Sequence, residues 1–229
     1  MIAGNRLLQR LGPVLKWASQ EDLIPVNFTP DIRKAPEQKR TRKLSDAELR
    51  KIWAACGDDL GNREVAKNFG RMVRFLLVTA QRRDEAASLK HGHILDGVWR
   101  QTDNKSSRPH SLKLPPLAKS LVGRGEARDF VFAGSVGKIS GFSKLKIALD
   151  EASGVSDWRL HDLRRTCVSG MARLGVPPHV ADKVLNHQSG TISGVAAVYQ
   201  RHEFLAERKD ALERWGAHIA NLKNLSLAA

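Results

Sequence analysis

The chain has 229 residues, and its 38 lysine and arginine residues outnumber its 24 acidic residues to give a formal net charge of +14. Hydrophobic residues make up 41% of the chain, enough for a packed core, so a wholly disordered protein is excluded. There is no apolar run of about 18 residues, and the only cysteines, Cys56 and Cys167, are far apart, which argues against a membrane span, a disulfide scaffold and a zinc finger. The charge favours a polyanionic partner, either nucleic acid or an anionic membrane surface.

The first 43 residues are predicted to form a helix followed by a linker. Apolar side chains recur near helical spacing over residues 5–22, which indicates an amphipathic helix. Three prolines between positions 25 and 36 then interrupt any periodicity. The following stretch is basic and is either a solvated charged surface or a segment that binds DNA phosphates; its basic residues are Arg33, Lys34, Lys39, Arg40, Arg42 and Lys43.

From Leu44 onward the pattern predicts a mainly α domain with a small antiparallel β-sheet, an α+β fold. Ser45 and Glu48 form a capping box that begins a helix reaching about Ala55. Asp96-Gly97 is a tight-turn signal between two short strands. Further helices are expected at 63–79, 83–89, 140–152, 159–174, 178–186, 191–199 and 203–222, and strands at 93–95, 98–101 and 110–114.

Two arginines and a histidine are the first candidates for chemistry. His161 and Arg164 are three residues apart on a predicted helix and therefore share a face. Such a pair alone is usually a surface feature, but Arg82 directly follows a long apolar helix. A guanidinium stays charged and presents paired donors that match a phosphate, so these three side chains are suited to hold one phosphodiester.

Three more residues become candidates by their context. Lys105 lies in a polar turn between two predicted strands, which is either an ordinary hairpin or a loop whose lysine reaches a phosphate or a leaving oxygen. His187 ends the segment Leu185-Asn186-His187. Tyr199 is the only tyrosine of the chain and follows small residues, a position that alone indicates packing more often than nucleophilic chemistry.

Taken in order, these motifs resemble those of the tyrosine recombinases, and most closely the phage and genomic-island integrases. The series is Thr79-Ala80-Gln81-Arg82-x-x-Glu85, Lys105 in a hairpin, His161-x-x-Arg164, Leu185-Asn186-His187 and Tyr199, and it extends over about residues 44–215. Two positions depart from the family, which usually has glycine where Ala80 and Asn186 stand. Lys105 is preferred to Lys113 and Lys90 because it lies three residues before Arg108, as the resemblance expects.

The resemblance implies a fold and a domain organisation. Residues 36–229 are expected to adopt the catalytic-domain fold of tyrosine recombinases and integrases. Residues 1–35 resemble the last helix of that family's core-binding, SAM-like domain together with its exit linker. They are therefore expected to be the C-terminal remnant of such a domain.

The resemblance also implies an enzyme that performs site-specific DNA recombination and integration through a 3′-phosphotyrosine, without a metal or any other cofactor. Tyr199 is then the nucleophile, and Arg82 and Arg164 offset charge on the phosphate. His161 assists proton transfer, and Lys105 protonates the leaving 5′-oxygen. His187 donates a hydrogen bond to a phosphate oxygen, and Glu85 supports Arg82. The residues expected to contact DNA are the six basic residues of 33–43 together with Arg108 and Arg165.

The implied partners are double-stranded DNA attachment sites, a tetrameric assembly on DNA and accessory DNA-bending proteins. The free protein is expected to be a monomer or a weak oligomer. A bacterial or phage-encoded protein of this kind acts in the cytoplasm, at the nucleoid and away from membranes, which agrees with the absence of an apolar signal-peptide core. Two alternatives remain: DNA relaxation like that of a type IB topoisomerase, and a non-catalytic DNA-binding protein in which residues 160–186 form a helix-turn-helix. Dependence of activity on a defined pair of sites separates recombination from relaxation.

Overall fold

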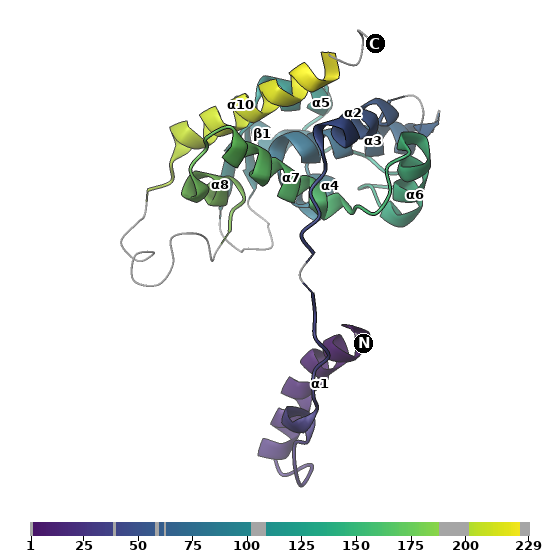
Figure 1. The fold of residues 1–229 in the computed structure, drawn as a ribbon, viewed down its shortest axis with the longest axis vertical. Helices are drawn as coiled ribbons and strands as arrows, with labels where there is room; N and C mark the ends of the chain where they lie inside the picture. Colours follow the sequence, from purple (N-terminus) through teal and green to yellow (C-terminus); the bar gives the residue numbers. More distant parts are fainter. Residues whose placement is uncertain are drawn as a thin grey trace. The chain divides into compact units, whose positions relative to one another are not determined.

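The computed structural model describes residues 2–38, 40–57, 60–61, 63–101, 109–187 and 202–224. The chain divides into two compact units, Met1–Thr41 and Arg42–Ala229, which we call the N-terminal and the C-terminal unit (Figure 1). The division falls a few residues beyond the boundary at 35/36 that the sequence suggests. Within the described residues, no helix has the length and apolar character needed to cross a membrane.

The N-terminal unit consists of the helix α1, Ile2–Gln20, and the short 3₁₀ helix η1, Thr29–Asp31. The buried Asn5 side chain ties α1 to the returning chain, because its Nδ2 donates to Ala35 O at 2.8 Å and its Oδ1 accepts from Ala35 N at 2.9 Å. Four large apolar side chains of α1 are 41–57% exposed, namely Leu7, Leu11, Val14 and Trp17. The predicted amphipathic helix is therefore present, with its apolar residues largely exposed to solvent.

The C-terminal unit is arranged around the helix α3. Side chains all along this helix are buried, and Phe69, Phe75 and Val78 have no exposed surface. Its neighbours are α4, α5, α7 and α10. The elements are α2 (Asp46–Ala55), α3 (Glu64–Thr79), α4 (Arg83–Ala87), the 3₁₀ helix η3 (His91–His93), β1 (Ile94–Leu95), β2 (Val98–Gln101), β3 (His110–Lys113), α5 (Pro116–Val122), α6 (Phe142–Ser153), α7 (Leu160–Arg173), α8 (Pro178–Val184) and α10 (Leu205–Asn224).

The three strands form one antiparallel sheet in the order β1-β2-β3. Asp96 and Gly97 join the first two with φ angles of 51° and 70°, the positive values that a tight hairpin turn requires. The Trp99 ring lies 5.6 Å from that of Phe75, so β2 packs onto α3. Gln101 at the end of β2 pairs with His110 at the start of β3, and we call this pair the base of the β2–β3 hairpin.

The helix α10 lies across one face of the C-terminal unit, where it contacts α8, α2, α5, α3, α7 and β3 (Figure 1). Trp215 at its centre is fully buried, and its Nε1 donates to Leu77 O on α3 at 2.8 Å. Gly170 on α7 makes room for this ring, because a Cβ at that position would overlap it. The C-terminal helix is thus fixed to its own chain by a buried aromatic side chain.

The structure confirms the predicted fold class, since helices dominate and the only sheet among the described residues is small and antiparallel. Ser45 accepts from the amide of Glu48 and the Glu48 side chain accepts from that of Ser45, so the capping box is confirmed as well. The helix α5 was not predicted, although Pro116 occupies its first position, where proline favours the start of a helix. The predicted helix at 191–199 lies outside the described residues.

Candidate active site

Arg82 lies in a tight turn between α3 and α4. The helix α3 ends at Ala80, which adopts the left-handed conformation with φ 57° and ψ 18° and so turns the chain sharply. Glu85 in the first turn of α4 then holds Arg82 twice: its Oε2 accepts from Arg82 N at 3.0 Å, and its Oε1 accepts from Arg82 Nη1 at 2.7 Å. The Glu85 carboxylate is nearly buried whereas the Arg82 side chain is 25% exposed, so the guanidinium is oriented from behind while part of it stays accessible.

Arg164 on α7 connects this turn to a second one. Its Nη1 donates to Ala80 O at 2.6 Å, and its Nη2 donates to Leu185 O at 2.5 Å, at the end of α8. Burial, together with the nearby charge of Arg82, lowers the pKa of Arg164 to about 10, so the side chain remains protonated at neutral pH. One buried cation therefore fixes the chain two residues before Arg82 and two residues before His187.

The second turn explains the Leu185-Asn186-His187 motif. Asn186 has a φ of 51°, and after glycine, asparagine is among the residues that tolerate this left-handed conformation best. Asparagine thus replaces the usual glycine without changing the turn. The His187 ring that follows is 40% exposed, and its Nδ1 lies 3.4 Å from Asp182 Oδ1. Burial and the charge of Arg164 lower the pKa of His187, and Asp182 opposes this effect in part. The lowered pKa favours the neutral ring.

His161 lies one turn before Arg164 on α7 and is exposed. Partial burial of its ring and the charges of Arg165 and Arg164 lower its pKa, an effect that Asp162 opposes in part. A neutral imidazole beside two cations is able to accept a proton at physiological pH. The structure thus brings Arg82, His161, Arg164 and His187 within electrostatic range of one another.

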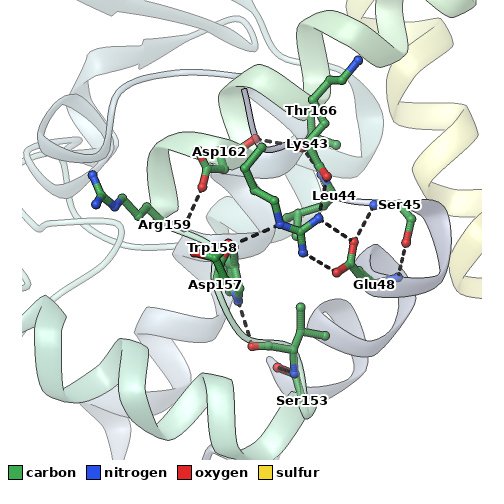
Figure 2. A network of polar contacts seen from close by, with 12 residues as sticks. Lys43, Leu44, Ser45, Glu48, Ser153, Asp157, Trp158, Arg159, Asp162 and Thr166 are labelled. Atoms are coloured by element: carbon green, nitrogen blue, oxygen red, sulfur yellow. Dashed lines mark hydrogen bonds and ion pairs between the residues drawn. The ribbon is translucent and has the colours of Figure 1, made fainter. Parts of the chain in front are cut away.

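A network of polar contacts around Asp162 fixes the start of α7 (Figure 2). Asp162 is fully buried, and its carboxylate accepts from Arg159 N at 2.9 Å and from the Arg165 guanidinium. Thr166 Oγ1 donates to Asp162 O at 2.8 Å and accepts from Leu44 N at 2.9 Å. This network holds the first turn of α7, which carries His161, and it joins that turn to the segment before α2. This role of Asp162 was not predicted, although an acidic residue in the first turn of a helix is a recognised stabilising signal.

The same region anchors Arg42. Its guanidinium pairs with Glu48, and its Nε donates to Asp157 O at 3.2 Å. The hydrogen bond with Arg42 lowers the pKa of Glu48 to about 2. Arg42 and Arg165, both expected to contact DNA, thus have guanidinium groups that also bind carboxylates of their own chain. The other described basic residues of the linker differ in exposure: Arg33, Lys34 and Lys43 are exposed, while Arg40 is partly buried.

The base of the β2–β3 hairpin lies near the arginines. His110 is 5% exposed, and its Nδ1 lies 3.4 Å from Nη2 of Arg208 on α10. Burial and the charge of Arg208 lower the pKa of His110 to about 3, with smaller effects from Arg164 and Arg82. A neutral His110 is therefore able to accept a hydrogen bond from Arg208, and His110 at the start of β3 lies within electrostatic range of both candidate arginines.

Several predicted site residues lie outside the described residues, namely Lys39, Lys105, Arg108 and Tyr199. Their neighbours in sequence are described: Gln101 and Pro109 flank the first gap that concerns the site, and His187 and His202 flank the second. Among the residues that the structure describes, no group of three or more His, Cys, Asp or Glu side chains is placed to hold a metal ion.

Comparison with known proteins gives a family match and several similar folds. The model of the phage integrase family matches residues 42–204, well over half of the chain. No curated protein matches the chain significantly.

The solved structures with similar folds include a lambda integrase dimer bound to a core site, which is 18% identical with a TM-score of 0.63 over 82% of this chain and 72% of that one. The integrase of mycobacterium phage Brujita is 20% identical, with a TM-score of 0.57 over 91% of this chain and 70% of that one. A lambda integrase tetramer bound to a Holliday junction is 18% identical, with a TM-score of 0.62 over 82% and 59%. At these identities the likeness shows a shared fold.

Proposed function

The chain belongs to the phage integrase family and is a tyrosine recombinase that carries out site-specific DNA recombination, and from that premise we propose that its reaction proceeds through a 3′-phosphotyrosine on Tyr199. The observation that supports this proposal most is the arrangement around Arg164. Its guanidinium is bound to the turn that leads to Arg82 and to the turn that leads to His187. The three phosphate-binding candidates Arg82, Arg164 and His187 come from distant parts of the sequence, and these contacts fix their positions relative to one another.

The two arginines bind the scissile phosphate and offset the charge that develops on its oxygens. A pentacoordinate phosphorus carries more negative charge on its non-bridging oxygens than the ground state does, so fixed cations stabilise the transition state selectively. Arg82 is aligned for this role by Glu85, and His187 adds a hydrogen bond to a phosphate oxygen. Two N–H donors of Arg164 bind backbone carbonyls, so its remaining N–H donors are available to the phosphate.

The named side chains account for every proton that is transferred in the reaction. The Tyr199 oxygen attacks phosphorus, forms the phosphotyrosine bond and gives its proton to neutral His161. The bond from phosphorus to the 5′-oxygen breaks, and Lys105 supplies the proton that this poor leaving group needs. A 5′-hydroxyl from another strand then reverses these transfers and rejoins the DNA. The phosphotyrosine conserves the energy of the broken bond, so strand exchange needs no external energy source.

The partner of this reaction is double-stranded DNA that carries attachment sites. We propose that strand exchange takes place in a tetramer on two such duplexes, because the lambda integrase relative has been seen as a tetramer bound to a Holliday junction. Accessory proteins that bend the DNA, and action in the cytoplasm at the nucleoid, belong to the same proposal. The exposed basic residues Arg33, Lys34 and Lys43 contribute salt-dependent contacts to DNA phosphates.

Residues 1–35 contribute to the same DNA complex. We propose that they are the last helix and the exit linker of a core-binding domain. The exposed apolar side chains of α1 support this assignment, because a helix with such a face is normally covered in a complete helical domain.

A suicide substrate tests the assignment of Tyr199. The DNA carries a nick close to the scissile phosphate, so the short strand dissociates after cleavage and the covalent complex accumulates. We expect an adduct that survives denaturation and that peptide mass analysis maps to Tyr199, with the phosphate at the DNA 3′ end. The control is Tyr199→Phe, which removes a single oxygen and is expected to keep DNA affinity while the adduct is lost. An adduct in the Tyr199→Phe protein, or a serine adduct at a 5′ end, would contradict the assignment.

A further inference from the structure

Two buried glutamines join the Arg82 turn to the β2–β3 hairpin. Gln81 is 3% exposed and Gln101 is 5% exposed, and Nε2 of Gln101 donates to Oε1 of Gln81 at 3.2 Å. Nε2 of Gln81 donates in turn to Thr79 O at 2.9 Å and to Val184 O at 3.0 Å. Both donor positions and the acceptor of the Gln81 amide are thus used, and they connect the end of α3, the end of α8 and the end of β2.

Each of these contacts lies next to a group of the proposed reaction. Gln81 directly precedes Arg82, and Val184 directly precedes Leu185, whose carbonyl binds Arg164. Gln101 is the last residue of β2, and Lys105 follows it by four positions. On the opposite strand, β3, Ser111 O accepts from Arg208 of α10, and His110 lies beside the same arginine. Gln101 at the end of β2 and His110 at the start of β3 are therefore both bound to other elements of the site.

A hydrogen-bonded amide pair fixes the relative position of the two segments more strictly than an apolar pair would. Burying two amides costs free energy unless their hydrogen bonds are made, whereas leucine or methionine would fill the same space without that cost. The amides, however, fix distance and direction between the hairpin and the arginine turn, while apolar contacts allow sliding. The pair is thus better suited to alignment than to stability alone.

Resting on the proposed function, we propose that Gln81 and Gln101 are positioning residues: they hold the end of β2, four residues before Lys105, against the Arg82 turn, and protonation of the leaving 5′-oxygen depends on that contact. Neither glutamine touches the reacting atoms. Their effect is on the step in which the leaving oxygen receives its proton. A role in folding alone would instead lower every activity of the protein to a similar degree.

The test compares two substrates with the variant Gln101→Met, which keeps the length of the side chain and removes its amide. One substrate is the normal suicide DNA, and the other carries sulfur at the bridging 5′ position. A thiolate leaves without needing a proton, since thiols ionise near pH 8.5. We expect cleavage of the normal DNA to become about tenfold slower, the size of one hydrogen bond, and cleavage of the sulfur substrate to stay within about twofold of wild type. The matched control is Asn68→Leu, at a buried amide that donates to Ala133 O at 3.1 Å near the other end of α3 and is expected to affect both substrates equally.

Equal slowing of both substrates in Gln101→Met, or no slowing of either, would overturn the inference. If this variant does not fold, Gln101→Asn carries the same test, because it keeps an amide but shortens the side chain beyond reach of Gln81. Lys105→Ala is measured in parallel. If sulfur does not restore cleavage in Lys105→Ala, the proposed role of Lys105 is wrong. If it restores Lys105→Ala but not the Gln101 variants, the proposed function stands and the positioning role is wrong.

Discussion

Arg164 and Arg42 are two arginines of the C-terminal unit that bind their own chain in different ways. Arg164 is 4% exposed and donates to the carbonyls of Ala80 and Leu185. Arg42 is partly exposed and, besides donating to the carbonyls of Asp157 and Lys43, pairs with the carboxylate of Glu48. The first arginine meets neutral partners that cannot lose their acceptor at any pH. The second depends on a charge that protonation removes and salt screens.

This difference in partners distinguishes Arg164, in the candidate site, from Arg42, which lies outside it. A cation that binds neutral carbonyls keeps its full charge for a substrate phosphate, because no carboxylate neutralises it in the direct contacts described for it. Arg82 lies between the two cases, since Glu85 holds it through one nitrogen and its backbone amide. Of these three arginines, Arg164 is the one whose described direct contacts are all with neutral acceptors.

The largest expected effect is that of Arg164→Lys. An ammonium group cannot reach both carbonyls and a phosphate together, because it lacks the planar, forked geometry of a guanidinium. We expect cleavage of the suicide substrate to fall by about 10³-fold and the free energy of unfolding to fall by about 2–4 kcal/mol, since at least one buried carbonyl loses its partner. The control Arg42→Lys should keep the cleavage rate within about twofold. Wild-type stability in Arg164→Lys would show that the two carbonyl contacts do not hold the site.

A smaller effect is expected from Glu48→Gln, and it depends on pH. The Glu48 pKa is lowered in the folded protein from its ordinary 4.5 to about 2, so its ion pair stabilises the fold above about pH 4.5 and is lost as the pH falls toward 2. We expect the variant to be less stable by about 1–2 kcal/mol at pH 6, with the difference shrinking steadily below pH 4.5. Chemical unfolding at pH 6 and pH 3 measures this. A difference that stays constant with pH would exclude the ion pair as its cause.

The smallest effect is expected from Ala80→Gly. A left-handed φ of 57° costs alanine about 1 kcal/mol. Glycine relieves that cost but loses about 0.5–1 kcal/mol more conformational entropy on folding. The two terms nearly cancel, so stability should change by less than about 1 kcal/mol and cleavage should stay at the wild-type rate. Thermal unfolding checks the first expectation, and a loss above about 2 kcal/mol would mean that packing of the buried Cβ outweighs the backbone strain.

Local patterns were sufficient to predict much of the fold. The Ser45–Glu48 capping box, the long apolar helix α3 and the Asp96-Gly97 turn all depend on residues close in sequence, and the structure has them where they were expected. The helix α5 was missed although it has the same length as the predicted α8 and, like it, begins with a proline. Spacing and side-chain chemistry singled out Arg82, His161 and Arg164, and the family resemblance then assigned roles to the whole set of candidate residues.

What local patterns could not predict are contacts across the chain. Nothing in the sequence near Gln81 or Gln101 indicates that their amides meet, since both are ordinary polar residues that become buried only when β2 packs beside α3. Arg42 and Arg165 likewise read as part of a basic surface, whereas the fold brings each to a carboxylate. Charge alone therefore does not distinguish an arginine that binds DNA from one that also binds its own domain.

We propose that Arg82 and Arg164 together neutralise one scissile phosphate and that Arg164 in addition holds the two turns of the site together. The most direct test is a suicide substrate whose scissile phosphate is replaced by an uncharged methylphosphonate, cleaved by Arg82→Ala and by Arg164→Ala. Removing a negative charge from the substrate reduces the need for a neutralising cation. We predict that the methylphosphonate largely removes the defect of Arg82→Ala and that the defect of Arg164→Ala persists, because its carbonyl contacts remain broken. Equal defects of both variants on both substrates would contradict the claim.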